Sequence, residues 1–202
     1  MRLIRMPRSF YLQPTLKVAS DLLGLFLVRK VGKKMVVGKI VEVEAYLGSK
    51  DPASHAFRGK TPRNEAMFLQ GGHLYVYFTY GMHFCCNVVT ERKGVGHAVL
   101  LRALEPIEGI EVMRRRRHLR SADDSTALCG GPARLCQAFM INKRDNGIDL
   151  CGKDIWIGKQ ENSPDEQGIA RSARVGITSG KHHRWRFYRK GSPYVSPGRP
   201  ST

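Results

Sequence analysis

The stretch that decides the fold is Met35-Val36-Val37-Gly38-Lys39-Ile40-Val41-Glu42-Val43-Glu44-Ala45-Tyr46. It has the pattern of a long β-strand, in which successive side chains point to opposite faces. One face is expected to carry Val37, Val41, Val43 and Ala45, and the other Ile40, Glu42, Glu44 and Tyr46. Ionised carboxylates are costly to bury among apolar side chains, so this acid pair indicates either a solvated face or a functional site.

The length and composition suit one globular domain, which we expect to span residues 1–202. Hydrophobic residues make up 42% and charged residues 25% of the chain, and no apolar run is long enough to cross a bilayer. The N-terminal residues lack the apolar segment and the cleavage site of a secretion signal. The sequence therefore predicts a soluble, cytoplasmic protein with no membrane partner.

The charge balance points to a polyanionic partner. Lysine and arginine total 34 against 17 acidic residues, which gives a net charge of +17. Neutralising phosphates releases condensed counterions, so such a protein binds nucleic acid in a salt-dependent way. Nucleic acid is favoured over a membrane surface because no basic amphipathic helix with a broad apolar face occurs. A basic composition without a specific partner is the alternative.

The cysteines and histidines do not predict a disulfide scaffold or a metal site. The cysteines are odd in number and have no C-x-x-C spacing, so they are expected to be core thiols in a reducing compartment. They are Cys85, Cys86, Cys129, Cys136 and Cys151. The adjacent His182 and His183 would point apart in a strand and have no evident third ligand, so no metal is expected.

Turn residues and hydrophobic periodicity divide the chain into short elements. Helices are expected at 14–23, 106–117 and from 130 to 139, with the arginines at 114–117 favourably placed at a helix C-terminus. Strands are expected at 25–31, 35–46, 74–80, 82–89 and 99–104, and loops at 48–63 and 121–126, the latter polar and mobile. The loop at 48–63 follows the acid strand, where functional residues often lie.

Three candidate sites each have an ordinary structural alternative. An aromatic stripe such as Tyr75 and Tyr77 is usually core, but Tyr80 beside the Gly81 turn is placed to wedge between bases. His55 could complete a pocket with Tyr46 and Tyr77 or be a surface histidine. Gly130-Gly131-Pro132-Ala133-Arg134 places free amides and a cation at a helix start, which suits a phosphate or an ordinary capped helix equally.

Several motifs, in order along residues 10–196, resemble the alkyladenine (3-methyladenine) DNA glycosylases. They are Val41-Glu42-Val43-Glu44-Ala45-Tyr46-Leu47-Gly48, Thr61-Pro62-Arg63-Asn64, Leu74-Tyr75-Val76-Tyr77, Tyr80-Gly81-Met82, Leu100-Leu101-Arg102-Ala103-Leu104-Glu105-Pro106, Cys129-Gly130-Gly131-Pro132, Ala173-Arg174-Val175-Gly176 and Arg189-Lys190-Gly191-Ser192-Pro193. The resemblance implies a monofunctional glycosylase that flips alkylated or deaminated purines out of duplex DNA. Such an enzyme hydrolyses the N-glycosidic bond and leaves an abasic site for base excision repair.

The resemblance also implies roles for individual residues. Glu44 matches the catalytic acid that holds and deprotonates the attacking water, with Arg102 and the main chain of Val175 fixing that water. In the base pocket, Tyr46, His55 and Tyr77 match stacking walls, the His55 amide matches a donor to the purine edge, and Asn87 matches the group that disfavours the amino group of guanine. Tyr80 matches the residue that fills the gap in the duplex, and the residues expected near the DNA backbone are Lys60, Thr61, Arg63, Met67, Arg134 and Lys143.

We therefore expect an α+β domain with a curved, mostly antiparallel β-sheet, flanking helices and a protruding β-hairpin. It should act as a monomer, without metal or cofactor, on double-stranded DNA that contains 3-methyladenine, hypoxanthine or ethenoadenine, in the cytoplasm and associated with a prokaryotic nucleoid. One alternative is a metal-dependent nuclease that uses Glu42 and Glu44 as ligands. The other is a non-enzymatic nucleic-acid-binding barrel in which both acids are structural.

Overall fold

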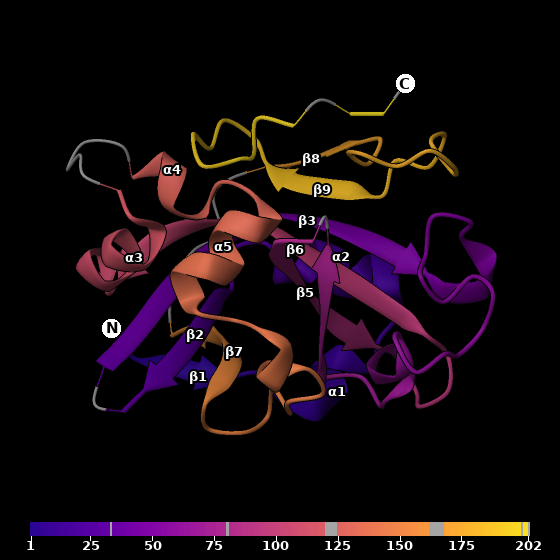
Figure 1. Cartoon of the computed structure of the whole chain (residues 1–202), viewed down its shortest axis with the longest axis horizontal. Coiled ribbons are helices and arrows are strands. Elements are labelled where there is room, and N and C mark those ends of the chain that lie inside the picture. Colours follow the sequence, from indigo (N-terminus) through magenta and orange to yellow (C-terminus); the bar gives the residue numbers. More distant parts are fainter. Residues whose placement is uncertain (33, 80, 120–124, 162–167, 199, 202) are drawn as a thin grey trace.

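The acid-bearing stretch forms the 14-residue strand β3 (Lys34–Leu47), which lies in the middle of the sheet (Figure 1). One edge of β3 pairs with β6 (His97–Glu108). The other edge pairs first with β2 (Phe26–Val31) and then, nearer its C-terminal end, with β9 (Arg186–Arg189). The predicted hairpin of strands 25–31 and 35–46 is thus confirmed.

The structure is a computed structural model that describes all residues except 33, 80, 120–124, 162–167, 199 and 202. Its remaining strands are β1 (Leu3–Arg5), β4 (Leu74–Thr79), β5 (His83–Thr90), β7 (Ile155–Gln160) and β8 (Ile169–Ser172). Its helices are α1 (Arg8–Tyr11), α2 (Thr15–Leu22), α3 (Ile110–Arg117), α4 (Thr126–Cys129) and α5 (Pro132–Phe139), with 3₁₀ turns η1 (Gly48–Lys50), η2 (Glu65–Phe68) and η3 (Lys143–Asp145).

The described strands form one nine-stranded sheet in which every named pair is antiparallel. The strand order is β1-β7-β2-β3-β6-β5-β4, and β9 joins β3 and carries β8 outside it. Helix α5 lies across the sheet, with α3 and α4 beside it (Figure 1). The predicted α+β class, with a mostly antiparallel sheet and flanking helices, is confirmed.

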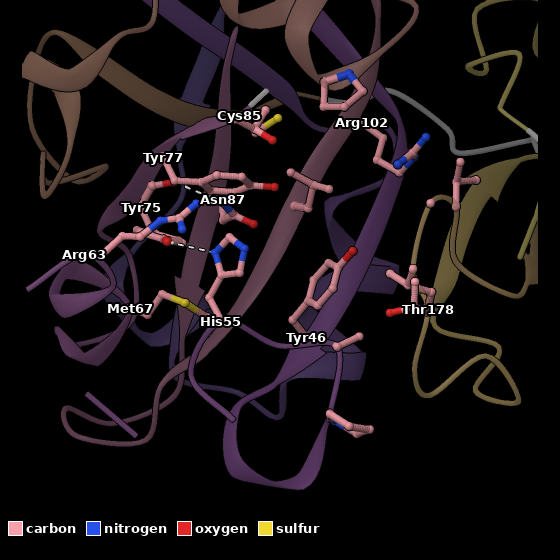
Figure 2. A pocket seen from close by; sticks show the side chains of 18 residues that line it. Tyr46, His55, Arg63, Met67, Tyr75, Tyr77, Cys85, Asn87, Arg102 and Thr178 are labelled. Carbon is pink, nitrogen blue, oxygen red and sulfur yellow. Dashed lines mark hydrogen bonds between the residues drawn. The ribbon is translucent and has the colours of Figure 1, made fainter. Parts of the chain in front are cut away.

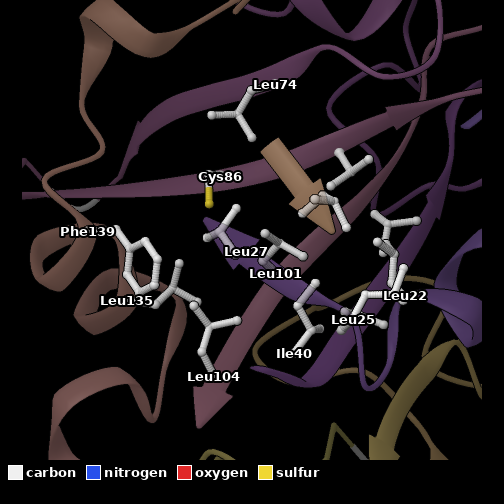
Figure 3. Packing of buried hydrophobic residues seen from close by; sticks show 14 of the residues in the cluster. Leu22, Leu25, Leu27, Ile40, Leu74, Cys86, Leu101, Leu104, Leu135 and Phe139 are labelled. Atoms are coloured by element: carbon white, nitrogen blue, oxygen red, sulfur yellow. The ribbon is translucent and has the colours of Figure 1, made fainter. Parts of the chain in front are cut away.

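The main hydrophobic core lies between the sheet and two helices, α2 and α5. Leu22 of α2 and Leu135 and Phe139 of α5 pack against Ile40 and Leu104 of the central strands (Figure 3). Pro132 occupies the first turn of α5, where its missing N–H costs no hydrogen bond, and Met140 ends the helix in a left-handed conformation. The predictions of helices at 14–23 and 130–139 are confirmed to within one or two residues.

The cysteines are free thiols, as predicted. Four of them are buried, and Cys151 is partly exposed. Burial raises the pKa of the Cys85 thiol to about 11, so this side chain is a neutral hydrogen-bonding group rather than a thiolate.

A β-bulge overturns the predicted division of β3 into two faces. The register against β6 shifts between Ile40, Glu42 and Val43. Before the shift Ile40 faces the main core, and after it Val43 and Ala45 do. The prediction that Ile40 shares a face with the acids is therefore wrong, because the extra residue reverses the alternation. The same reversal puts Glu42 and Glu44 on the face away from the main core.

The predicted helix at 106–117 begins too early. Strand β6 continues through Glu108, with Pro106 opposite Gly38 at a register shift where its missing N–H is tolerated. Gly109 then turns the chain with φ +76°, and α3 begins at Ile110. A Cβ atom at Gly109 would lie 2.6 Å from the Met35 carbonyl oxygen, so a side chain there would not fit.

The predicted protruding hairpin is formed by β4 and β5, which pair as far as Thr79 and His83. Phe78 and Met82, near its turn, are exposed apolar side chains. Tyr80 lies outside the described residues, as does most of the predicted mobile loop at 121–126. The end of that loop, from Thr126, is instead the start of α4, which the sequence did not predict.

Candidate active site

A cavity of about 470 Å³ opens on the outer face of β3, beside the C-terminal half of that strand. Tyr46 comes from β3, Tyr77 from β4, Asn87 from β5 and Arg102 from β6, so four neighbouring strands each contribute a wall. Two loops complete it, one following β3 and one between β8 and β9, together with Pro132 at the start of α5. Its lining residues are Tyr46, Pro52, Ala53, His55, Arg63, Met67, Tyr75, Tyr77, Thr79, Cys85, Asn87, Leu100, Arg102, Pro132, Val175, Gly176, Ile177 and Thr178.

Aromatic side chains stand on two sides of the cavity. Figure 2 shows His55 and Tyr77 on one side and Tyr46 on the other. The His55 and Tyr77 rings meet edge to face with centroids 4.5 Å apart, and the Tyr75 and Tyr77 rings stack at 5.5 Å. The Tyr75 hydroxyl lies 2.9 Å from Nδ1 of His55, which fixes the imidazole. The arrangement leaves a slot for a flat ring between aromatic walls.

The loop after β3 is shaped by the side chain of Asn64. Its Nδ2 donates to the carbonyls of His55 and Gly59, and its Oδ1 accepts from the Thr61 amide. None of the hydrogen bonds among the described residues uses the His55 amide. Burial, together with the nearby Arg63 guanidinium, lowers the pKa of His55, so the ring is neutral at physiological pH.

Glu44 lies directly behind the cavity wall. Its carboxylate has no exposed surface, yet it accepts hydrogen bonds from the Tyr46 hydroxyl at 2.9 Å and from the Val175 amide at 2.7 Å. Nη1 of Arg102 lies 3.4 Å from the same carboxylate. Burial raises the pKa of Glu44, although Arg102, the Val175 amide and the Tyr46 hydroxyl oppose that rise. Such a carboxyl group takes up a proton more readily than a solvent-exposed one, which suits a general base.

Glu42 occupies a different environment although it is equally buried. Its Oε1 accepts from Nε of Arg102 and from Nε of Arg186, each at 2.7 Å, and its Oε2 accepts from the Ser196 amide at 2.6 Å. Burial alone would raise the pKa of Glu42, but the two guanidinium groups outweigh it and lower the pKa. Glu42 is therefore an anion at neutral pH, and it orients Arg102. Neither acid lies on a solvated face. Hydrogen bonds and ion pairs from arginines and backbone amides compensate for the burial of both carboxylates.

The family model for methylpurine-DNA glycosylase (MPG) matches residues 9–193 of the chain. The chain belongs to the methylpurine-DNA glycosylase family. The prediction of an enzyme of the DNA glycosylase class, made from the resemblance, is thereby confirmed.

Bacterial relatives match this family member over nearly their whole length. A protein of Carboxydothermus hydrogenoformans is 49% identical over 192 residues, which cover 95% of this chain and 98% of the relative. A protein of Chlorobium phaeovibrioides is 46% identical over 198 residues, covering 98% and 99%. One from Francisella tularensis is 49% identical over 184 residues, covering 90% and 93%. Each bears the name "Putative 3-methyladenine DNA glycosylase".

The fold brings most of the predicted site residues together around the cavity. Tyr46, His55, Tyr77, Asn87, Arg102 and Val175 line the cavity, and Glu44 contacts three of the lining residues. Two of the six residues predicted to contact the DNA backbone, Arg63 and Met67, also line the cavity, whereas Lys60, Thr61, Arg134 and Lys143 do not. Lys60 is paired with Glu65 at 2.7 Å. No group of three metal-ligating side chains occurs among the described residues.

The sequence did not predict a pocket role for some of the residues that line the cavity. The aromatic stripe predicts that Tyr75 is a core residue, and it is buried in a small cluster; in addition it lines the cavity and contacts His55. Cys85 and Thr178 also line it, and Arg174 lies directly behind Tyr46. The alternation of β4, which puts Tyr75 on the same face as Tyr77, was the one signal that could have identified Tyr75. None of the described helices has the length and apolarity needed to cross a membrane.

Proposed function

We propose that this protein is a monofunctional DNA glycosylase that flips damaged purines out of duplex DNA and hydrolyses their N-glycosidic bond. Its substrates are 3-methyladenine, hypoxanthine and ethenoadenine. The product is an abasic site for base excision repair. The observation that carries the proposal is the buried Glu44 carboxylate, held against the wall of an aromatic-sided cavity.

The cavity is suited to a flipped base. Extruding a nucleotide from a duplex costs a few kcal/mol, and least for a damaged or mispaired base. Stacking on aromatic side chains contributes about 1–3 kcal/mol per base, which offsets much of that cost. A base between Tyr46 on one side and His55 and Tyr77 on the other gains this stacking on both faces. Weakly paired bases are therefore selected before any chemistry takes place.

Polar groups in the cavity support selection for particular purines. The His55 amide donates to no group in the described part of the chain, so it is suited to donate to an acceptor on the purine edge. Asn87 is nearly fully buried, and its Nδ2 donates to the Tyr75 carbonyl at 3.1 Å, which fixes the orientation of the amide. A fixed amide can reject the additional amino group of guanine, because that group would meet a donor or an occupied volume.

Glu44 acts as general base. Loss of a purine leaves positive charge on the sugar, and a nearby carboxylate both stabilises this charge and accepts the proton of the attacking water. Arg102 and the Val175 main chain orient the water and the carboxylate. Tyr46 and Arg102 both line the cavity and both contact Glu44. Because Glu44 has no exposed surface, the water must pass between these two side chains to reach the carboxylate. Because burial raises the pKa of Glu44, its carboxylate accepts the proton of the water more readily than an exposed carboxylate would.

The net charge of +17 supports binding to double-stranded DNA. The exposed Phe78 and Met82 put apolar side chains near the hairpin turn. We assign Tyr80, which lies between them in the sequence, to the gap that the flipped nucleotide leaves. The positions assigned to the DNA backbone are Lys60, Thr61, Arg63, Met67, Arg134 and Lys143. We propose a monomer, without metal or cofactor, acting in the cytoplasm on the nucleoid.

The metal-dependent nuclease remains the alternative from another enzyme class. It is disfavoured because both oxygens of Glu42 already accept hydrogen bonds from arginine, serine and amide donors. A metal would have to displace these donors to bind.

A product analysis distinguishes these functions. The protein is incubated with a duplex that carries one hypoxanthine, in parallel with Mg²⁺ and with EDTA, and the strand is examined before and after alkali. We expect an intact strand before alkali, cleavage at the lesion after it, and no protein–DNA adduct on borohydride treatment. Strand breaks before alkali that EDTA abolishes would indicate the nuclease, and a trapped adduct would indicate a covalent lyase. Absence of abasic sites with every damaged purine would refute the proposed function.

A further inference from the structure

Arg174 is a fully buried arginine that joins two segments beside the cavity. Its Nη1 donates to Asp51 Oδ2 at 2.5 Å and to the Ala45 carbonyl at 3.0 Å, and its Nη2 donates to Asp51 Oδ1 at 2.8 Å. One guanidinium group thus ties the end of β3 and the loop that follows it to the loop before Val175. The two-pronged geometry with Asp51 requires the planar fork of arginine.

The same guanidinium lies against the ring of Tyr46. Its central carbon is 4.6 Å from the Tyr46 ring centroid and 5.1 Å from that of Trp185. Arg174 does not line the cavity, whereas Tyr46 does, so the guanidinium supports the ring from behind. The ion pair with Asp51 has no net charge, so it restrains the ring without adding charge to the pocket.

Arg174 also precedes Val175, whose amide donates to Glu44. Glu44 accepts hydrogen bonds from the Tyr46 hydroxyl and from the Val175 amide. Arg174 is next to both donors, because its guanidinium contacts the Tyr46 ring and Val175 is the following residue in the chain. Interactions that fix reacting groups matter because a displacement of about 1 Å can cost about 100-fold in rate.

We infer that Arg174, clamped by Asp51, is a positioning residue that fixes the Tyr46 ring and the Val175 amide around the Glu44 carboxylate. The inference rests on the proposed function, since it assigns how that site is held. Arg174 touches neither the base nor the water and acts through its two neighbours.

The position of Arg174 predicts a change in pH dependence as well as in rate. The charged and titratable groups that face Glu44 are Arg102 from β6, Tyr46 and Glu42 from β3, and Tyr77 from β4. The Tyr46 hydroxyl and the Val175 amide lower the pKa of Glu44 against the effect of burial. Loosening these two donors therefore raises the pKa and moves the acid limb of the rate profile to higher pH.

The test compares wild type, Arg174→Lys and Asp51→Asn in single-turnover excision of hypoxanthine from a duplex. Both variants should lose about 10- to 100-fold in the rate constant, bind a duplex with an abasic-site analogue as tightly as wild type, and show an acid limb at higher pH. Asp51→Asn removes the clamp while leaving Arg174 in place, so the inference stays testable if Arg174→Lys does not fold.

Arg189→Lys is the matched control. Arg189 is also a fully buried arginine, and it donates to the Leu23 carbonyl outside the cavity. This variant should be destabilised without a change in the rate constant or the acid limb. Wild-type rates and an unshifted acid limb in folded Arg174→Lys or Asp51→Asn would overturn the inference while leaving the proposed function intact. A wild-type protein that releases no damaged purine would overturn both.

Discussion

The substitution Glu42→Gln should destabilise the protein strongly, because one carboxylate holds two buried arginines. Arg102 and Arg186 both donate to Glu42 through Nε, and the side chains of all three residues are less than 8% exposed. Removing one partner of a buried ion pair costs about 3–5 kcal/mol, because it leaves an uncompensated charge. Glutamine keeps one acceptor oxygen but places its amide group against another donor. We therefore expect the lower end, about 3 kcal/mol.

The loss is measured by urea unfolding and by the melting temperature at neutral pH. For a chain of this length, 1 kcal/mol corresponds to about 2–4 °C, so the melting temperature should fall by about 6–12 °C. Glu105→Gln, a change of the same kind on β6 outside the cavity and the Glu42 network, is the control and should alter stability by no more than about 0.5 kcal/mol.

The pH dependence gives a second check on the same variant. The folded-state pKa of Glu42 is lowered, so its contribution to stability is present above the unfolded-state pKa and is lost as pH falls through the folded-state value. The gap between wild type and Glu42→Gln should therefore be full at neutral pH and close on acidification. Equal stability of the two proteins at neutral pH would refute the assignment of Glu42 as the anion that holds the two arginines.

Three further predictions concern the pocket and its support. The rate of base excision should rise with pH, and the pH at half-maximal rate should lie above 4.5, since burial raises the pKa of Glu44 and the ionised form is the base. A single-turnover pH profile with its half-maximal rate at or below pH 4.5 would contradict this. Tyr77→Ala should weaken binding to a duplex with a flipped damaged base by about 1–3 kcal/mol, measured by fluorescence anisotropy against an undamaged duplex, and equal affinities for wild type and variant would count against stacking. Gly48→Ala should cost about 1–3 kcal/mol in urea unfolding, because φ is +52° and a Cβ would lie 2.9 Å from the Val95 carbonyl oxygen and the His97 ring; an unchanged unfolding midpoint would show that the turn is not strained.

Local sequence signals predicted much of the fold. The hairpin of β2 and β3, the pair β4 and β5, and helices α2 and α5 were expected from periodicity and turn residues, which act within a few positions of one another. The prediction of a helix at 106–117 is wrong at its start, because a proline such as Pro106 is typical of a first helical turn. In the structure it is tolerated in a strand opposite a register shift, and that shift depends on a partner strand about 70 positions earlier.

The acids on β3 illustrate the limit of pattern reasoning. Alternation put Glu42 and Glu44 on one face, which the structure retains, but it also put Ile40 there. The bulge that sends Ile40 to the core depends on pairing with β6, which no local pattern reveals. Likewise, the burial of both acids rests on Arg102, Arg186 and the Ser196 amide, which come from distant parts of the chain.

The pocket residues were found mainly through the resemblance to a family rather than through local pattern. Tyr46, His55 and Tyr77 lie on separate segments, and only the folded sheet brings them around one cavity. Arg174 was part of a matching motif, but the motif did not indicate its role, because that role depends on Asp51 and the Tyr46 ring.

The most direct test of the account is the single-turnover excision rate of Glu44→Gln on a duplex with one hypoxanthine, measured beside its affinity for the same duplex. Because burial disfavours the ionised carboxylate, the neutral amide should not destabilise the fold at neutral pH. We predict that excision is abolished, or reduced by at least about 100-fold, while binding is retained. A folded variant that binds and excises hypoxanthine at the wild-type rate would contradict the claim that Glu44 activates the attacking water.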